Sequence, residues 1–240
     1  RGGSQGIEKK NVKEITGKPL VVWMIGAAKK VGAIDKIALS TNDATLLTEI
    51  HGWIDIMDIG FRHGLDVITR PDIISGPLAR SEEAVLHALK FFDDVDVVLM
   101  LQPTSPLTLP EDIEGVLEAL DEPTGSPVVS QFDSAFSVTP FDKFLWADSR
   151  NDGNDLHRGF IGINHDYMKP REMRQQRHGQ YLENGAVYAM RTEPFLKYEH
   201  RFCGFSNTYV MPKERSIEID DMTDFVMAEA LLKEREAVAV

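Results

Sequence analysis

Residues 19–32 read Pro-Leu-Val-Val-Trp-Met-Ile-Gly-Ala-Ala-Lys-Lys-Val-Gly, and this stretch is predicted to form a helix. Proline favours the first turn of a helix, and glycine favours the position just past its end. A buried strand is expected next at 36–41, and residues 43–49 then have the apolar spacing of a second helix. Helices that alternate with strands in this way indicate a largely parallel sheet.

The same alternation continues along the chain. Strands are expected at 54–59, 95–101 and 127–131, and helices at 81–92, with Ser81 as the N-cap, and at 110–120, with Asp112 near the positive end. Later segments are predicted as strands at 185–190, 208–211 and 216–219 and a closing helix at 222–235. We therefore expect an α/β fold, a Rossmann-like and mostly parallel sheet with helices on both faces and ligands at the carboxyl ends of its strands.

The alternation breaks between residues 133 and 183, where polar, aromatic and basic residues are mixed without a clear period. Such a segment is typical of an irregular insertion or of an arm that packs on a partner subunit. The predicted organisation is an α/β core at 1–132, an insertion at 133–183 and the remainder of the core at 184–240.

Composition excludes several classes of protein. The formal net charge of -12 argues against a nucleic-acid or acidic-membrane partner, since both are held by clustered Lys and Arg. The single cysteine, Cys203, can form no internal disulfide, and the longest apolar run, 19–28, is too short to span a bilayer. A soluble, cytoplasmic protein is expected. A short strand is also expected before Arg1, because glycine-rich loops normally follow a buried strand.

Residues 1–11, Arg-Gly-Gly-Ser-Gln-Gly-Ile-Glu-Lys-Lys-Asn, combine glycines, a hydroxyl group and several cations. Glycines let backbone N–H groups face phosphate oxygens, and nearby cations neutralise the charge of a polyphosphate. A Walker A loop is excluded because Pro19 follows Gly17-Lys18, and a dinucleotide fingerprint because Arg1 stands where glycine is needed. The alternative interpretation is a flexible, solvated basic turn.

This stretch resembles the nucleotide-binding signature of the CMP-sialic acid synthetases, or N-acylneuraminate cytidylyltransferases, which usually reads Ala-Arg-Gly-Gly-Ser-Lys-Gly-Ile with Lys-Asn shortly after. Further segments match the family in order, namely Gly17-Lys-Pro-Leu20, Ser40-Thr41, Arg70-Pro71, Leu101-Gln-Pro-Thr-Ser-Pro-Leu107, Glu183-Asn-Gly185 and Arg215-Ser-Ile-Glu-Ile-Asp220. The similarity covers nearly the whole chain. It implies transfer of CMP from CTP to a nine-carbon 2-keto sugar acid, by a Mg²⁺-dependent homodimer.

The resemblance also implies roles for individual residues. Arg1, Ser4, Gln5, Lys10 and Asn11 would lie along the phosphates and ribose of CTP, with Arg1 and Lys10 as catalytic cations. Cytosine would be recognised by Arg70, Ala79 and Ser81, whereas Gln102, Arg174 and Asn184 would bind the sugar acid. An arginine suits a carboxylate because its guanidinium donates two parallel hydrogen bonds. The alternative for Arg174 is a solvated side chain in a basic run.

Glu218 and Asp220 form an acidic pair. On a strand their side chains would share one face while Ile219 points into the core, and two carboxylates on one face can hold Mg²⁺. Asp220 is expected to be catalytic as well as a metal ligand. Two exposed edge-strand acids are the alternative, and the neighbouring Asp221 and Asp224 are expected to serve the N-terminus of the final helix.

Several residues depart from the family's usual pattern. Glu218 replaces an aspartate, Gln5 a lysine and Asn42 an aspartate, and Arg80 lies in a segment that is normally small and hydroxylic. Two alternative functions therefore stay open. One is a cytidylyltransferase for legionaminic, pseudaminic or deaminated neuraminic acid, and the other is a catalytically silent nucleotide-binding homologue.

Overall fold

The computed structural model describes residues 6–58, 64–148, 159–171, 173 and 179–238, so the predicted roles of Arg1, Ser4, Gln5 and Arg174 fall outside the described residues. The chain forms two compact units, the larger comprising Arg1–Thr139 with Glu183–Val240 and the smaller Pro140–Leu182. Each unit is described by itself below.

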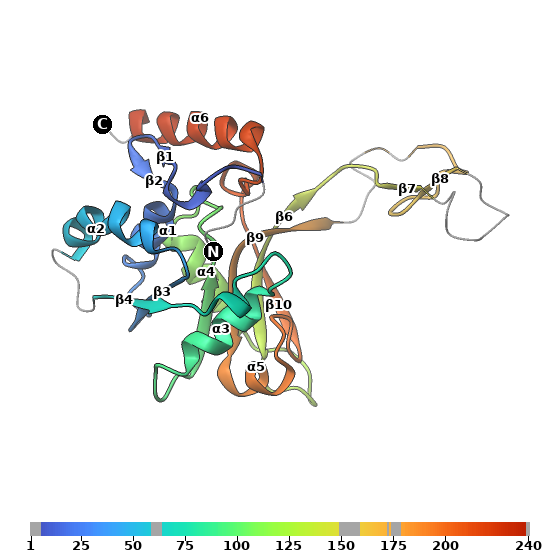
Figure 1. The fold of residues 1–240 in the computed structure, drawn as a ribbon. Coiled ribbons are helices and arrows are strands. Elements are labelled where there is room, and N and C mark those ends of the chain that lie inside the picture. The colour runs from blue at the N-terminus through green and yellow to red at the C-terminus, as the bar shows by residue number, and fades with distance from the viewer. Residues whose placement is uncertain (1–5, 59–63, 149–158, 172, 174–178, 239–240) are drawn as a thin grey trace. The chain divides into compact units, whose positions relative to one another are not determined.

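A four-stranded sheet lies at the centre of the larger unit (Figure 1). Its order is β10 (Ser206–Val210), β6 (Ser134–Phe141), β9 (Gln180–Arg191) and β5 (Val97–Leu101). β10 is parallel to β6, β5 is antiparallel to β9, and β3 (Ile37–Thr41) and β4 (Leu65–Thr69) form a separate parallel pair. The predicted α/β fold class is confirmed, with parallel and mixed sheets.

Alternation along β5 explains why helices cover both faces of this sheet. Val97, Leu99 and Leu101 pack with α1 (Leu20–Ala28) and α4 (Pro110–Asp121). Val98 and Met100 point the other way and pack with α3 (Ser81–Leu89) and α5 (Thr192–Tyr198). Successive side chains of a strand face opposite sides, so an unbroken apolar run requires apolar cover on both.

The remaining elements of the larger unit are short, apart from two helices. They are η1 (Lys10–Val12), β1 (Glu14–Ile15), β2 (Lys18–Pro19), α2 (Ala44–Asp58), η2 (Asp72–Ile74), η4 (Lys213–Arg215) and α6 (Met222–Val238). α6 packs Phe225, Ala228 and Leu232 into a core cluster that also contains Ile7 and Ile219. This cluster joins the two ends of the chain.

Four predictions of local structure were wrong. Residues 54–58 do not form a strand but continue α2, which begins after Asp43, whose Oδ1 accepts the N–H groups of Thr45 and Leu46. Residues 127–131 form no strand, because Val128 is 89% exposed and Ser126 Oγ accepts its N–H in a local turn. A short apolar run by itself does not distinguish a strand from a helix or an exposed turn.

The other two errors concern hydrogen bonding at segment ends. Ser81 is not the N-cap of α3, because Arg80 occupies that position and donates its backbone N–H to Glu83 Oε2 at 3.0 Å. Residues 216–219 belong to no strand. The N–H of Ile219 donates to Thr104 O at 2.8 Å, yet no ladder extends from this bond.

The smaller unit has its own packing. β7 (Trp146–Asp148) pairs with β8 (Phe160–Gly162) in antiparallel fashion. The ring of His165 packs edge-on against Phe144 and Trp146, with both centroid distances at 4.7 Å. Residues 134–139, which the sequence assigned to the irregular insertion, form part of β6 in the larger unit.

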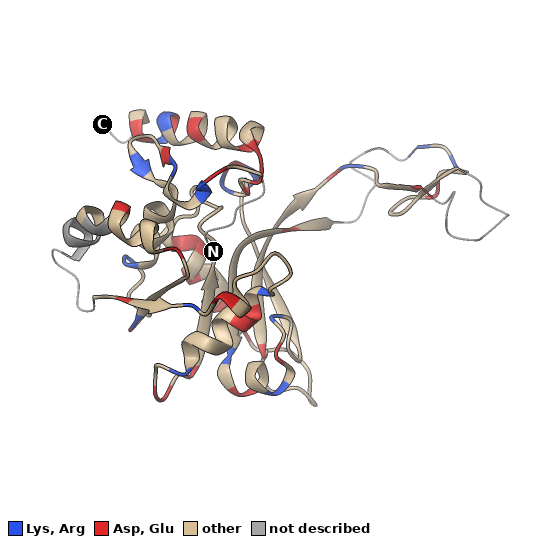
Figure 2. Ribbon diagram, in the orientation of Figure 1, with Lys and Arg blue, Asp and Glu red and all other residues tan. Residues whose placement is uncertain are grey.

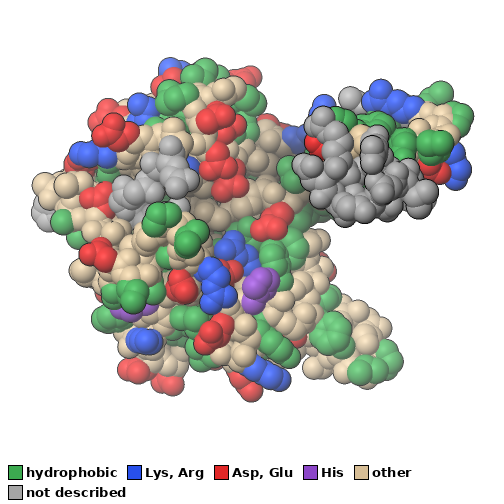
Figure 3. All heavy atoms as spheres, turned by 45° about the vertical axis from the view of Figure 1, so that its right-hand side comes forward, with side chains coloured by type: hydrophobic (Ala, Val, Ile, Leu, Met, Phe, Trp, Pro, Cys, Tyr) green, Lys and Arg blue, Asp and Glu red, His purple; other side chains and the backbone are tan. Residues whose placement is uncertain are grey.

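Charge is distributed as the composition suggests. Acidic residues are spread over the ribbon in Figure 2 and gather at the start of α3. On the described residues of the face in Figure 3, Lys and Arg side chains are scattered among Asp and Glu and form no continuous basic patch. None of the helices in the described part of the chain has the length and apolar content needed to cross a lipid bilayer.

Candidate active site

Lys10 connects the N-terminal loop to the segment that precedes α6. It begins η1, directly after Lys9, whose backbone is left-handed with φ of 50°. Its Nζ donates to the carbonyl of Ile219 at 2.7 Å and lies 3.3 Å from Asp220 Oδ1. The Lys10 side chain is only 13% exposed, so its charge is held at a fixed place beside the acidic segment.

Gly6 brings the N-terminal loop against the same segment. A Cβ added at Gly6 would lie 2.1 Å from the carbonyl oxygen of Asp220, so only glycine allows the two backbones to approach this closely. The predicted phosphate loop and the predicted metal-binding acids therefore meet, although more than 200 residues separate Lys10 from Asp220.

Glu218 and Asp220 have different surroundings. Ile219 between them is fully buried, as the sequence predicted, while the Asp220 side chain is 76% exposed. Glu218 is half-buried and accepts a hydrogen bond of 3.4 Å from Thr104 Oγ1. Burial, together with the negative charge of Asp220, raises the pKa of Glu218 above its usual range. A cation bound here would relieve this crowding of negative charge.

Gly185, within β9, lies close to Glu218. Gly185 has φ of +72°, and a Cβ on it would lie 2.6 Å from Glu218 Oε2. The preceding Asn184 is only 4% exposed, and its Oδ1 accepts a hydrogen bond from Ser137 Oγ at 2.6 Å while its Nδ2 donates to Ser216 Oγ at 3.1 Å. The structure therefore places the Asn184 amide in the core, where its hydrogen bonds hold this part of β9 beside Glu218.

Gln102 directly follows β5 and lies beside β9. Its backbone N–H donates to Ala186 O at 3.1 Å, which extends the pairing of β5 with β9 by one residue. Its carbonyl accepts from the N–H of Ser105, so residues 102–105 turn sharply away from the sheet. The half-buried Gln102 thus lies at the carboxyl end of β5, and α/β folds bind ligands at the carboxyl ends of their strands.

The residues predicted to recognise cytosine form a second group. Arg70 directly follows β4, and its guanidinium donates to both Oγ and the carbonyl of Ser40, which lies in the neighbouring strand β3. Ala79 ends a turn in which its N–H donates to Gly76 O, and Ser81 is the exposed first residue of α3. α3 packs against β3, so these residues come from adjoining elements.

The structure thus connects some predicted site residues directly and others only through the elements that carry them. Hydrogen bonds join Lys10 to Ile219 and Asp220, and the charges of Lys10 and Asp220 act on Glu218. Asn11 lies half-buried in η1 beside Lys10. Sequence reasoning missed Thr104 and Glu183, both of which act on Glu218. Both residues lie within the motifs matched above, but nothing in the sequence shows which carboxylate they approach.

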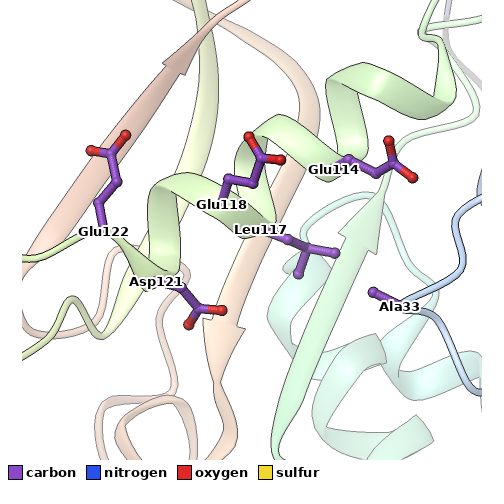
Figure 4. Close-up of a pocket in the computed structure, with 6 residues that line it drawn as sticks. All are labelled: Ala33, Glu114, Leu117, Glu118, Asp121 and Glu122. Carbon is purple, nitrogen blue, oxygen red and sulfur yellow. The ribbon is translucent and has the colours of Figure 1, made fainter.

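A hollow on the larger unit is separate from these residues. Figure 4 shows it lined by side chains of α4 and its C-terminal end, with Ala33 from the loop before β3. Its lining is mostly acidic, comprising Glu114, Glu118, Asp121 and Glu122 besides Leu117. None of the predicted site residues contributes to it.

Gly6→Ala tests the close approach of the N-terminal loop to Asp220. The added Cβ overlaps a backbone oxygen, so we expect a loss of about 1–3 kcal/mol in the free energy of unfolding. Urea denaturation measures this. Gly26→Ala is the control, because an added Cβ there meets nothing within 4 Å and alanine favours helix α1. Equal stability of Gly6→Ala and the unmodified protein would contradict the predicted contact.

Solved structures share this fold. The structure of CMP:2-keto-3-deoxy-manno-octonic acid synthetase complexed with CTP superposes with a TM-score of 0.63 at 13% identity, covering 97% of this chain and 95% of that one. A 4-diphosphocytidyl-2C-methyl-D-erythritol synthase from Anaerococcus prevotii gives a TM-score of 0.62 at 14% identity, covering 93% of each chain. The chain therefore shares the α/β fold of these two structures.

Residues 1–229 match the Cytidylyltransferase family, and the chain belongs to it. Over 95% of its length it is 29% identical to an N-acylneuraminate cytidylyltransferase of Escherichia coli and 28% identical to N-acylneuraminate cytidylyltransferase A of Danio rerio. It covers 49% and 48% of those proteins, respectively, so the chain spans about half the length of the curated relatives it matches. The resemblance deduced from the sequence is confirmed.

Proposed function

We propose that this protein transfers CMP from CTP to the anomeric hydroxyl of a nine-carbon 2-keto sugar acid, giving a CMP-sugar and pyrophosphate. The contact of Lys10 with Asp220 and the carbonyl of Ile219 supports this most strongly, because it joins a glycine-rich loop to a pair of carboxylates. Family membership and the names of the relatives agree with it.

The chemistry follows from these groups. The sugar hydroxyl attacks the α-phosphorus of CTP, forming a new P–O bond while the bond to pyrophosphate breaks in line with it. Lys10 and Arg1 neutralise the charge that develops on pyrophosphate, and the exposed carboxylate of Asp220 accepts the hydroxyl proton. Ser4, Gln5 and Asn11 position the phosphates and ribose, so catalysis rests on orientation and charge neutralisation.

Glu218 and Asp220 suit a magnesium ion. They carry more negative charge than Lys10 offsets, and Glu183 adds to it. The described residues contain no cluster of three or more metal-ligating side chains, so phosphate oxygens and water would complete the coordination of an ion held by this pair. Mg²⁺ would supply charge stabilisation at the α-phosphate and a lower pKa of the attacking hydroxyl.

The second group of residues suits an uncharged base. Glu82 and Glu83 in the first turn of α3 offset the positive end of the helix, so a phosphate is disfavoured there. Cytosine offers acceptors that Arg70 can donate to, and an amino group that backbone carbonyls near Ala79 can accept. Ser81 adds a hydroxyl beside them.

The sugar acid would be held by Gln102 and Arg174, and Asn184 would support the part of β9 that lies beside Glu218. We further propose a homodimer formed through the smaller unit, because Trp146, Phe160 and Ile163 expose between 49% and 61% of their surface there. Sedimentation of the protein as a monomer would contradict this assembly. The cytoplasmic location and the lack of a nucleic-acid or membrane partner stay predictions from the sequence.

Two alternative functions make different predictions. Another sugar acid of this class would use the same nucleotide site, so legionaminic, pseudaminic and deaminated neuraminic acids belong in any test. Gln5 and Glu218, which replace the family's usual residues, favour the other alternative, a silent homologue that binds CTP without turnover.

The test is release of pyrophosphate from CTP and Mg²⁺ by the full-length protein, with a panel of these sugar acids. The expected result is release with one of them and formation of the matching CMP-sugar by mass spectrometry. CTP binding without release across the whole panel would establish the silent homologue instead.

A further inference from the structure

A buried ion pair lies directly beside the predicted cytosine-recognising turn. Glu82 is the second residue of α3, next to Ser81, and its Oε1 accepts a hydrogen bond of 2.7 Å from Arg201 Nε. The two side chains are only 7% and 17% exposed. Burial of both partners distinguishes this pair from surface ion pairs, which constrain structure little.

Arg201 also contacts the central sheet. Its guanidinium lies over the ring of Tyr188, with 4.8 Å between the guanidinium carbon and the ring centroid, and Tyr188 is 2% exposed on β9. The Tyr188 hydroxyl donates to Glu183 Oε1. These contacts run from the first turn of α3 to Glu183, whose negative charge in turn acts on Glu218.

Both members of the pair are ionised. Burial alone would raise the pKa of Glu82, but the hydrogen bond and charge of Arg201 outweigh it and lower that pKa. Burial would likewise lower the pKa of Arg201, and the Glu82 carboxylate reverses the effect. A hydrogen-bonded pair of buried charges has few alternative geometries, because any displacement leaves a charge without its partner.

A hydrogen bond ties the residue before α3 to the first turn of the helix, because Glu83 Oε2 accepts the backbone N–H of Arg80. Farther along the helix, Val85, Leu86 and Leu89 pack into the core and fix the direction of its axis. The Glu82 contact with Arg201 lies at the other end, where Ala79 and Ser81 are carried.

We propose that Arg201 is a positioning residue for nucleotide recognition, which sets the place of residues 79–81 through Glu82 and thereby the selection of cytosine over other bases. The inference rests on the proposed function, since it assumes that this turn binds the base of CTP. Arg201 itself need not contact the nucleotide.

The test uses Arg201→Met and Glu82→Gln in the full-length protein. Calorimetric titration gives the Kd for CTP and for UTP, and steady-state kinetics give KM for each substrate and kcat. We expect Kd and KM for CTP to rise roughly tenfold and the preference for CTP over UTP to fall, while KM for the sugar acid stays within twofold. Arg201→Lys should recover part of the CTP affinity, because it restores the charge but not the stacked, planar donor.

Arg191→Met is the matched control, because Arg191 also makes a 2.7 Å ion pair, with Asp121, and its Nε donates to a backbone carbonyl. The double variant Arg201→Met/Glu82→Leu separates positioning from stability, since apolar replacement of a buried pair often preserves stability. A double variant with the thermal midpoint of the unmodified protein but a raised Kd for CTP supports the inference.

Recovery of both midpoint and CTP affinity in the double variant would overturn the inference, as would unchanged base preference in the single variants. Failure of the unmodified protein to bind CTP would overturn the proposed function and the inference with it. If the unmodified protein turns over CTP and the variants keep its CTP affinity and base preference, the inference is wrong and the proposed function stands.

Discussion

Asp220→Ala is expected to lower kcat for pyrophosphate release by about 10³-fold. The substitution removes a carboxylate proposed to hold Mg²⁺ and to accept the hydroxyl proton, and it leaves the Lys10 ammonium without its acidic partner. Loss of one such electrostatic group typically costs about 10²–10³ in kcat, and loss of a metal ligand adds to this. The Asp220 side chain is 76% exposed, so the fold should survive, and circular dichroism checks that it does.

Asp221→Ala is the matched control for this prediction. Asp221 is the next acidic residue, but its Oδ1 accepts the N–H groups of Thr223 and Asp224 at the start of α6. Its removal should lower the thermal midpoint slightly and leave kcat within about twofold. Comparable activity of Asp220→Ala and Asp221→Ala would show that Asp220 has no role in the reaction.

Arg215→Met is expected to lower the free energy of unfolding by about 3–5 kcal/mol. Arg215 donates from Nε and Nη2 to the two carboxylate oxygens of Asp112 at 2.8 and 2.7 Å. The Asp112 side chain is fully buried in the first turn of α4, so the variant leaves a carboxylate in the core without its cation. Urea denaturation followed by far-UV circular dichroism measures the loss.

Lys233→Met is the control, because the Lys233 ion pair with Glu229 lies on the surface of α6, where such pairs contribute little. The double variant Arg215→Met/Asp112→Leu should recover much of the lost stability, since it removes the unpaired charge as well. A loss below about 1 kcal/mol for Arg215→Met would mean that water reaches Asp112, contrary to its burial.

Local sequence patterns predicted the elements that are long or clearly bounded. α1 begins after Pro19, and Asp221 and Asp224 bind the N–H groups at the start of α6, as expected. The errors fall where one pattern fits two structures. The segment 54–59 is six residues long, and only its continuation from α2 shows that residues 54–58 are helical.

The prediction of the site depended on local sequence patterns in the same way. Residue types and motif spacing pointed to Lys10, Glu218 and Asp220, and the structure brings these three together. The sequence placed the two acids on a strand. In the structure residues 216–219 form no strand, but Ile219 between the two acids is buried as predicted. Asn184 was expected to bind substrate. Its place in the core depends on hydrogen bonds with Ser137 and Ser216, which no local pattern of the sequence connects to it.

The sequence by itself therefore determined the α/β class, the cytidylyltransferase family and the residue types of the site. These features depend on side-chain periodicity and on motifs within a few residues, which any short window contains. Only the tertiary structure decided that Lys10 binds the carbonyl of Ile219, that Arg215 neutralises Asp112 and that Arg201 pairs with Glu82. Each contact joins residues more than 100 positions apart, and its geometry exists only once the sheet and its covering helices have closed around it.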